Sequence, residues 1–291
     1  MDTSRYKAFL TAADTGSLKK AADTLGYTPS GVSQLVKALE EELDIILLQR
    51  GKKGVTLTQE GSMLLPIIRE LLLQESRLFQ LSADMKGLAI GNINVASYHC
   101  LAAVWMPELI SGFCKKYPGI RIKLLEGTQQ GIMGYLDAKI ADVAFFNDSQ
   151  PMNYDWIPLM EDRMLAVLPQ NHPLAGETVF PIEAFRHERF IMPEHGEDYD
   201  VFEILDQFQI TPDIYLSTFD SFTAIAMVGK GLGVSLMNEI SIQDWRKDII
   251  ALPTEPPYVI KMGIALPSLN NASPSVRKFV EYAVEILTKA L

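Results

Sequence analysis

Side chains that can donate or accept hydrogen bonds gather near the N-terminus, in the stretch from residue 17 to residue 58. Hydroxyl and amide groups can read the edges of bases, and lysine and arginine can pair with phosphates. We therefore expect this stretch to contact double-stranded DNA. The residues expected at the contact are Ser17, Thr28, Pro29, Ser30, Ser33, Gln34, Lys37, Arg50, Lys52 and Lys53.

Two short helices joined by a tight turn are expected to position these groups. Ser17 is a suitable cap for a helix at residues 18–25, and Gly26 ends that helix. Thr28 can cap the next helix, in which Pro29 takes a first position that needs no backbone N–H. Apolar residues then recur at helical spacing and leave a polar face free. This order predicts a helix-turn-helix whose second helix enters the major groove.

A basic hairpin follows the second helix. Two β-rich runs, at residues 45–50 and 55–58, flank the Gly-rich turn 51–54 and predict a wing. The cations of this wing suit phosphates or the minor groove. A plain helical hairpin with a solvated basic loop is the alternative interpretation of the same pattern.

The net charge of −10 argues against nucleic acid only if it is evenly spread. Residues 1–90 hold 11 Lys and Arg and 11 Asp and Glu, whereas residues 91–291 hold 15 and 25. All of the excess negative charge therefore lies in the last two thirds of the chain. Because a DNA-binding face needs local cations rather than a basic total, the N-terminal third is compatible with DNA.

A long helix is expected at residues 59–88, with Thr58 as its cap. Its apolar residues form a broad stripe, and Pro66 inside it predicts a local kink. A helix this long and apolar needs a partner, which is either a second chain or the rest of this one.

Strand-like and helix-like runs alternate through residues 91–291, which predicts an α/β fold with a mostly parallel sheet. We expect strands at residues 92–96, 120–125, 142–146, 163–168, 190–192, 213–217, 233–237 and 260–266. We expect helices at residues 98–117, 129–138, 197–208, 221–228 and 275–291.

Short motifs along the whole chain resemble the LysR-type transcriptional regulator family. In the N-terminal stretch the resemblance lies in Ser17, Ala21-Ala22, Val32-Ser33, Leu39-Glu40, Arg50 and Val55-Thr56-Leu57-Thr58. In the body it lies in PELISGFCKKYPGIRIKLLEG, LAVLPQNHPLAG and VGKGLGVSLM. Gly31, Asp44 and Leu48 depart from the family's usual Ala, Gly and Phe, and none of these changes removes an expected DNA contact.

The resemblance implies a winged helix-turn-helix at residues 1–58, a linker and dimerisation helix at 59–88 and an effector-binding domain at 89–291. That last domain is expected to be two-lobed and α/β, like type 2 periplasmic binding proteins. Lobe I would comprise about 91–162 and 267–291, and lobe II about 163–266. The implied partners are double-stranded DNA, a small-molecule effector, further copies of the chain in a dimer or tetramer, and RNA polymerase.

The implied effector site is the cleft between the lobes, where strand ends meet helix N-termini. Free N–H groups and helix dipoles favour a small organic anion there. Plainer alternatives are helix-capping hydroxyls, histidines with ordinary partners and a core phenylalanine. The residues expected to contact the effector are Ser97, Tyr98, His99, Thr128, Phe146, Asn147, Glu194, His195, Asp220 and Ser221.

The sequence contains no G-x-S-x-G, Walker A or H-E-x-x-H pattern, so we expect neither an enzyme nor a cofactor. Cys100 and Cys114 lack the spacing of a metal site and are interpreted as buried thiols. No apolar run is long enough to span a bilayer, and the N-terminus lacks the core of a secretory signal. We therefore expect a cytoplasmic protein. A two-lobed solute-binding or catalytic protein that oligomerises through its N-terminal helices is the competing class.

Overall fold

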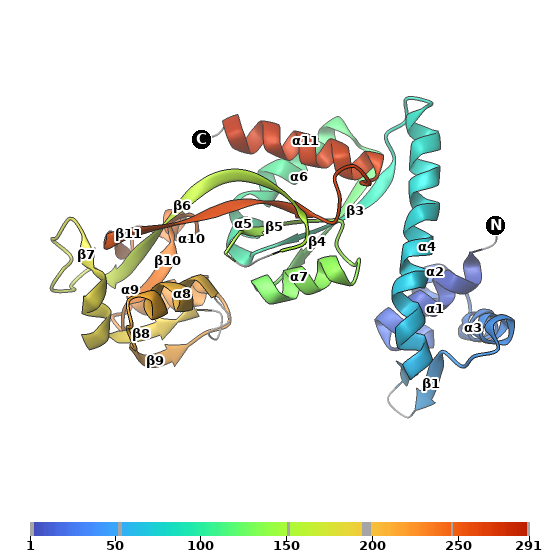
Figure 1. The fold of residues 1–291 in the computed structure, drawn as a ribbon, viewed down its shortest axis with the longest axis horizontal. Coiled ribbons are helices and arrows are strands. Elements are labelled where there is room, and N and C mark those ends of the chain that lie inside the picture. Colours follow the sequence, from blue (N-terminus) through green and yellow to red (C-terminus); the bar gives the residue numbers. More distant parts are fainter. Residues whose placement is uncertain (1–2, 52–53, 150–151, 194–198, 246, 290–291) are drawn as a thin grey trace. The chain divides into compact units, whose positions relative to one another are not determined.

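The computed structural model describes residues 3–51, 54–149, 152–193, 199–245 and 247–289 (Figure 1). The chain divides into two compact units, Met1–Lys86 and Gly87–Leu291.

Three helices and a hairpin open the first unit. They are α1 (Ser4–Thr15), α2 (Leu18–Leu25), α3 (Pro29–Leu43), β1 (Leu48–Gly51) and β2 (Gly54–Leu57). The predicted caps are confirmed: Ser17 Oγ accepts from the Lys20 N–H at 3.3 Å, and Thr28 Oγ1 accepts from the Gly31 N–H at 3.1 Å. These bonds satisfy backbone donors that the first turn of each helix leaves free.

The first strand of the hairpin begins later than the predicted residue 45. Glu40 in α3 accepts hydrogen bonds from the N–H groups of Leu47 and Leu48, at 2.8 and 3.0 Å. Asp44 adopts a left-handed conformation, with φ of 55°, and ends α3. The segment between helix and strand is thus a turn held by a helix side chain.

Helix α4 (Gln59–Asp84) completes the first unit and includes Pro66. Thr58 Oγ1 caps it by accepting from the Gly61 N–H at 2.8 Å. The helix ends before the predicted residue 88, and Gly87 then adopts φ of 72°. The buried core of this unit includes Phe9, Val36, Leu39 and Ile68, which join α1, α3 and α4.

One sheet runs through the second unit. Its strands are β3 (Gly91–Ser97), β4 (Ile120–Glu126), β5 (Val143–Asn147), β6 (Asp155–Pro169), β10 (Ser235–Asn238) and β11 (Ile249–Leu266), in the order β10-β6-β11-β5-β3-β4. Strand β3 is parallel to β4 and β5, whereas β6 and β11 pair antiparallel with each other and with β10 and β5, respectively. The prediction of a mostly parallel sheet is therefore wrong. The sheet is mixed because two long strands of opposite direction run along its middle.

Lobe I contains β3, β4 and β5 with α5 (His99–Val104), α6 (Met106–Lys116), α7 (Gln129–Asp137) and α11 (Pro274–Lys289). Helices α6 and α11 cover one face of the sheet and α7 the other (Figure 1). Val143 and Phe145 of β5 accordingly pack on one side, and Ala144 packs on the other. The single helix expected at residues 98–117 is two helices, because Pro107 at the start of α6 lacks the N–H that a continuous helix needs.

Lobe II holds the parallel pair β8 (Arg189–Met192) and β9 (Asp213–Ser217), together with α8 (Tyr199–Gln207), α9 (Ser221–Gly229) and α10 (Glu239–Ile242). Short elements add to it: β7 (Phe180–Pro181), which pairs with β11, and the 3-10 turns η1 (Ile182–His187) and η3 (Gln243–Trp245). Strand β11 already pairs with β5 over residues 262–265. The chain therefore returns to lobe I before residue 266, earlier than the predicted boundary.

Candidate functional site

The exposed face of α3 carries the side chains expected to read base edges. Ser30, Ser33, Gln34 and Lys37 recur at helical spacing, and Gln34 and Lys37 are exposed. Lys37 pairs with Glu41 at 3.3 Å, but the two side chains remain 71% and 65% exposed. An exposed pair of this kind is weak, so Lys37 can exchange its partner for a phosphate.

The wing meets this face through Arg50. Its Nη2 donates to Ser33 Oγ at 2.8 Å, from β1 to α3. With its oxygen accepting from Arg50, the Ser33 hydroxyl can still donate its proton to a base acceptor. The structure thus brings these two predicted residues together in one surface.

The other predicted DNA contacts take different places. Thr28 and Pro29 are exposed at the N-terminal end of α3, where the Thr28 and Ser30 hydroxyls lie 3.1 Å apart. Ser17 is half-buried and caps α2. Lys52 and Lys53 lie outside the described residues.

Backbone contacts anchor the wing to the helices on both sides. The Val55 N–H donates to the Gly16 carbonyl at 2.9 Å, at the turn between α1 and α2. A Cβ added to Gly61 in α4 would lie 2.2 Å from the Leu47 carbonyl oxygen, which leaves room only for glycine. The wing and the helix-turn-helix therefore form one packed head.

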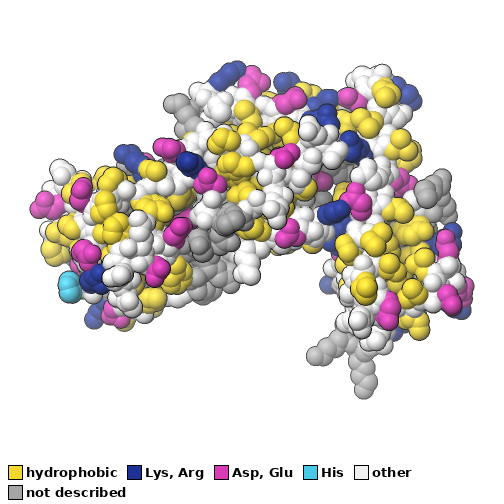
Figure 2. All heavy atoms as spheres, in the orientation of Figure 1, with side chains coloured by type: hydrophobic (Ala, Val, Ile, Leu, Met, Phe, Trp, Pro, Cys, Tyr) yellow, Lys and Arg dark blue, Asp and Glu magenta, His cyan; other side chains and the backbone are white. Residues whose placement is uncertain are grey.

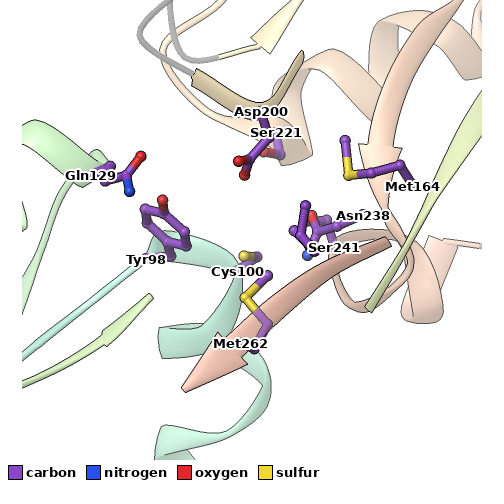
Figure 3. Close-up of a pocket in the computed structure, with 10 residues that line it drawn as sticks. Tyr98, Cys100, Gln129, Met164, Asp200, Ser221, Asn238, Ser241 and Met262 are labelled. Carbon is purple, nitrogen blue, oxygen red and sulfur yellow. The ribbon is translucent and has the colours of Figure 1, made fainter. Parts of the chain in front are cut away.

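In the second unit, a cavity of about 30 Å³ lies between the lobes (Figure 3). This volume holds about two water molecules. Its lining comes from lobe I, lobe II and the two long strands, and consists of Tyr98, Cys100, Gln129, Met164, Asp200, Ser221, Asn238, Ser241, Ile260 and Met262. Figure 3 shows the Tyr98 hydroxyl and the Gln129 amide reaching from one side toward Asp200 and Ser221 on another.

Beside the cavity, a hydrogen-bonded chain links the two lobes. Gln129 Nε2 donates to Asn147 Oδ1 at 3.3 Å, and Asn147 Nδ2 donates to Asp200 Oδ2. Asn147 at the end of β5 is 0% exposed, and Asp200 in the first turn of α8 is 6% exposed. Because the contact is buried and joins elements of both lobes, it stabilises the arrangement of the lobes in this structure.

A second carboxylate lies next to the cavity wall. Asp162 on β6 is 2% exposed and accepts from Asn238 Nδ2 at 2.7 Å and from the Ile240 N–H at 3.3 Å. Burial raises the pKa of Asp162 to about 6, although these two hydrogen bonds oppose the shift. The carboxyl group orients Asn238, whose side chain lines the cavity.

Of the residues expected to bind an effector, Tyr98 and Ser221 line the cavity, and Asn147 lies beside it. Ser97 is fully buried and donates to the Tyr98 carbonyl at 3.1 Å. Thr128 is the N-cap residue of α7 and is 9% exposed. Ser97 and Thr128 thus lie at a strand end and a helix start, as expected, but their hydroxyl groups do not line the cavity.

Three predicted effector contacts lie elsewhere, and two lie outside the described residues. Phe146 is fully buried between Tyr98 and Trp156, so its aromatic ring belongs to the core and not to the lining. His99 packs edge-on against Phe219, with ring centroids 5.6 Å apart. Asp220 caps α9 by accepting from the Thr223 N–H at 2.9 Å. Glu194 and His195 lie outside the described residues.

Two family models match the chain: "LysR substrate binding domain" over residues 86–288, and "Bacterial regulatory helix-turn-helix protein, lysR family" over residues 3–62. The chain belongs to the LysR family of transcriptional regulators. A Bacillus subtilis HTH-type transcriptional regulator, YvbU, is 31% identical to this LysR-family regulator over 290 residues, which is 98% of this chain and 99% of YvbU.

Two solved structures show the same fold as this regulator. Full-length CbnR, solved with its target DNA, has a TM-score of 0.66 at 18% identity and covers 98% of this chain and 99% of its own. The effector-binding domain of QuiR, solved with shikimate, has a TM-score of 0.61 at 20% identity and covers 69% of this chain and 99% of its own. In the part of the regulator that the structure describes, no helix is long and apolar enough to cross a membrane.

Several lining residues of the regulator were not predicted from its sequence. Gln129 follows a predicted cap and could have been found from that position alone. Asp200, Asn238 and Ser241 approach the cavity from lobe II, where their sequence context carries no cleft motif. Met164 lies on β6, and Ile260 and Met262 lie on β11; these two long strands form one wall of the cavity.

Proposed function

We propose that this DNA-binding transcriptional regulator is controlled by a small molecule bound in the cavity between its lobes. The observation that carries the proposal is the cavity itself, which both lobes line with polar groups and beside which the Asn147–Asp200 contact joins the lobes. QuiR, whose effector-binding domain has the same fold, was solved with shikimate. Contact with RNA polymerase, expected from the family, stays a prediction.

Effector binding is expected to require movement within the second unit. A cavity of about 30 Å³ is smaller than any organic effector, so the lobes must separate or lining side chains must rotate. An effector that binds one arrangement better than the other then shifts the equilibrium between them. Rupture of the contact between Asn147 and Asp200 is the local change that we expect to accompany this shift.

Pairing of two chains through α4 is the second part of the proposal. Met63, Ile67, Leu78, Leu81 and the C-cap residue Met85 recur along one face of α4 and are 39–87% exposed. Apolar side chains are visible at the surface of this unit (Figure 2). An exposed stripe of this length is typical of a protein interface. Paired heads match the two-fold arrangement in which helix-turn-helix dimers read two half-sites, and an effector would alter how the heads are presented.

Fluorescence anisotropy with a labelled fragment of the protein's own promoter region tests the function. We expect saturable binding at low salt, weaker binding as salt rises, and a change in affinity or footprint when an effector is present. Gln129→Leu is expected to keep DNA binding and to lose the response, because Gln129 lies in the cavity and not in the head. Absence of promoter binding at low salt would contradict the assignment of the DNA target. Equal loss of DNA binding and response in Gln129→Leu would contradict the cavity assignment.

A further inference from the structure

Helix N-termini near the cavity suggest a negatively charged ligand, but the charged group in the lining is itself negative. Among the described lining residues, Asp200 is the carboxylate, and neither lysine, arginine nor histidine is present. The other lining groups are neutral: hydroxyls, amides, sulfur atoms and one isoleucine side chain. An anion entering this space would meet a like charge where water is scarce and screening is weak.

Protein carboxylates already lie at the helix N-termini that suggest an anion. Asp200 lies in the first turn of α8. Asp220 accepts from both the N–H and the hydroxyl of Thr223 at the start of α9, at 2.9 and 2.8 Å. Asp162 accepts from the Ile240 N–H in α10. Asp220 and Asp162 each satisfy a backbone donor, and all three carboxylates oppose the positive ends of the α8, α9 and α10 dipoles, so these three helix ends are less favourable to a negative ligand.

The two nearest described groups that can carry positive charge, Arg163 and His99, lie outside the lining. Arg163, the cation next to Asp162 in the chain, pairs with Glu239 at 2.8 Å and keeps its side chain 60% exposed. It is thus neutralised at the surface and does not line the cavity. His99 lies near Glu126, at 3.9 Å, and is also outside the lining. Among the described residues, neither of these two groups therefore offsets the charge of Asp200 from within the lining.

We propose that the effector is a small organic cation, with an ammonium, amidinium or guanidinium group that binds Asp200. This inference rests on the proposed function of the cavity. A cationic group forms charge-assisted hydrogen bonds to the carboxylate, and the hydroxyl oxygens of Tyr98 and Ser221 can accept hydrogen bonds from its remaining N–H groups. Met164, Ile260 and Met262 provide an apolar surface for the carbon skeleton. By binding Asp200, the cation competes with Asn147 and releases the contact between the lobes.

Cationic and anionic probes of similar size test the sign of the charge with the full-length protein. Benzylamine, 1,4-diaminobutane and agmatine are compared with benzoate and succinate by isothermal titration calorimetry and thermal unfolding. We expect at least one of the amines to bind and to raise the melting temperature of the second unit, because a ligand of the native state stabilises it by mass action. The carboxylates are expected to cause no shift. Binding of a carboxylate, or failure of all three amines to bind, would overturn the proposal.

Two substitutions in one helix locate the binding group. Asp200→Asn keeps an oxygen that can accept from Asn147 but removes the charge, and we expect it to weaken amine binding about 10- to 100-fold. Asp206→Asn makes the same change at an exposed position of α8 and should leave amine affinity unchanged. Unchanged affinity in Asp200→Asn would refute the assignment to Asp200. The wild-type comparison of amines with carboxylates decides the charge of the effector even if Asp200→Asn fails to fold.

Promoter binding separates this inference from the proposed function. A protein that binds its promoter and responds to a carboxylate would keep the proposed function and lose the cationic effector. A protein that binds amines at Asp200 but no DNA would lose the proposed function and keep the cation site. Anisotropy with the promoter fragment, with and without each probe, distinguishes these outcomes.

Discussion

Arg50→Ala is expected to weaken DNA binding in a way that depends on salt and not on sequence. Arg50 is exposed on the wing and reaches Ser33 at 2.8 Å, so it lies beside the face of α3 that is expected to enter the major groove. If it neutralises one phosphate, its loss removes about 0.9 from the slope of log K against log salt concentration. Between 50 and 200 mM salt this slope change corresponds to about a threefold difference in affinity.

Anisotropy titrations at several salt concentrations measure this slope for a promoter fragment and for a scrambled duplex. The variant should lose affinity for both duplexes alike. Gln34→Ala is the matched comparison on α3: it should cost about 1–3 kcal/mol on the promoter alone and leave the slope unchanged. Arg50→Lys keeps the charge and should keep the slope. An unchanged slope in Arg50→Ala would refute the phosphate contact.

The hydrogen bond to Ser33 offers a different role for Arg50, and a double-mutant cycle distinguishes the two. If Arg50 acts only by orienting the Ser33 hydroxyl toward a base, Arg50→Ala and Ser33→Ala should reduce sequence preference equally. The double variant would then be no worse than either single variant. If Arg50 binds phosphate, the two effects should add, and only Ser33→Ala should change sequence preference.

Leu78→Glu on the apolar stripe of α4 is expected to yield monomers in light scattering, whereas Ser76→Glu on the opposite face should leave the mass unchanged. Burial raises the pKa of Asp162 from 3.8 to about 6. The protonated carboxyl group therefore contributes to the free energy of unfolding below about pH 4, and this contribution is lost as the pH rises through 6. Asp162→Asn should remove up to about 3 kcal/mol of this pH dependence in urea unfolding, and an unchanged pH profile would contradict the burial argument. Gly61→Ala would place a Cβ 2.2 Å from the Leu47 carbonyl oxygen, so calorimetry should show an earlier melting of the head, with the second unit unchanged.

The head was the part of the fold that local sequence signals could predict. Ser17, Thr28 and Thr58 are each followed by a helical run, and each caps a helix in the structure. The late start of β1 was not predictable in this way, because Glu40 sets it through hydrogen bonds to residues seven and eight positions later. Local patterns find caps and breaks, but they do not reveal a side chain that reaches beyond its own helix.

The two long strands of the second unit show a different limit of sequence reading. Strand β11 contains Pro253, Pro256 and Pro257, and proline cannot donate to a strand ladder, so only its last part was predicted. In the structure the register of β11 against β6 shifts between Pro253 and Tyr258, which lets the strand pass this segment. Strand β6 similarly contains Pro158 and the charged run at residues 161–163. Both strands were therefore predicted to be shorter than they are, and the antiparallel pairs that they form were not predicted.

The charge of the cavity could not be predicted from the sequence for a related reason. The helix starts near Thr128 and Ser221 could be predicted, and a helix start alone favours an anion. Which carboxylates lie near the cavity depends on contacts between distant parts of the chain: Asp162 lies on β6, yet it accepts from the Ile240 N–H in α10. Asp200 approaches the cavity from α8 and meets Asn147, which is 53 residues away in sequence. The cationic effector proposed above would follow from carboxylates at helix starts, with the positions of those starts unaltered.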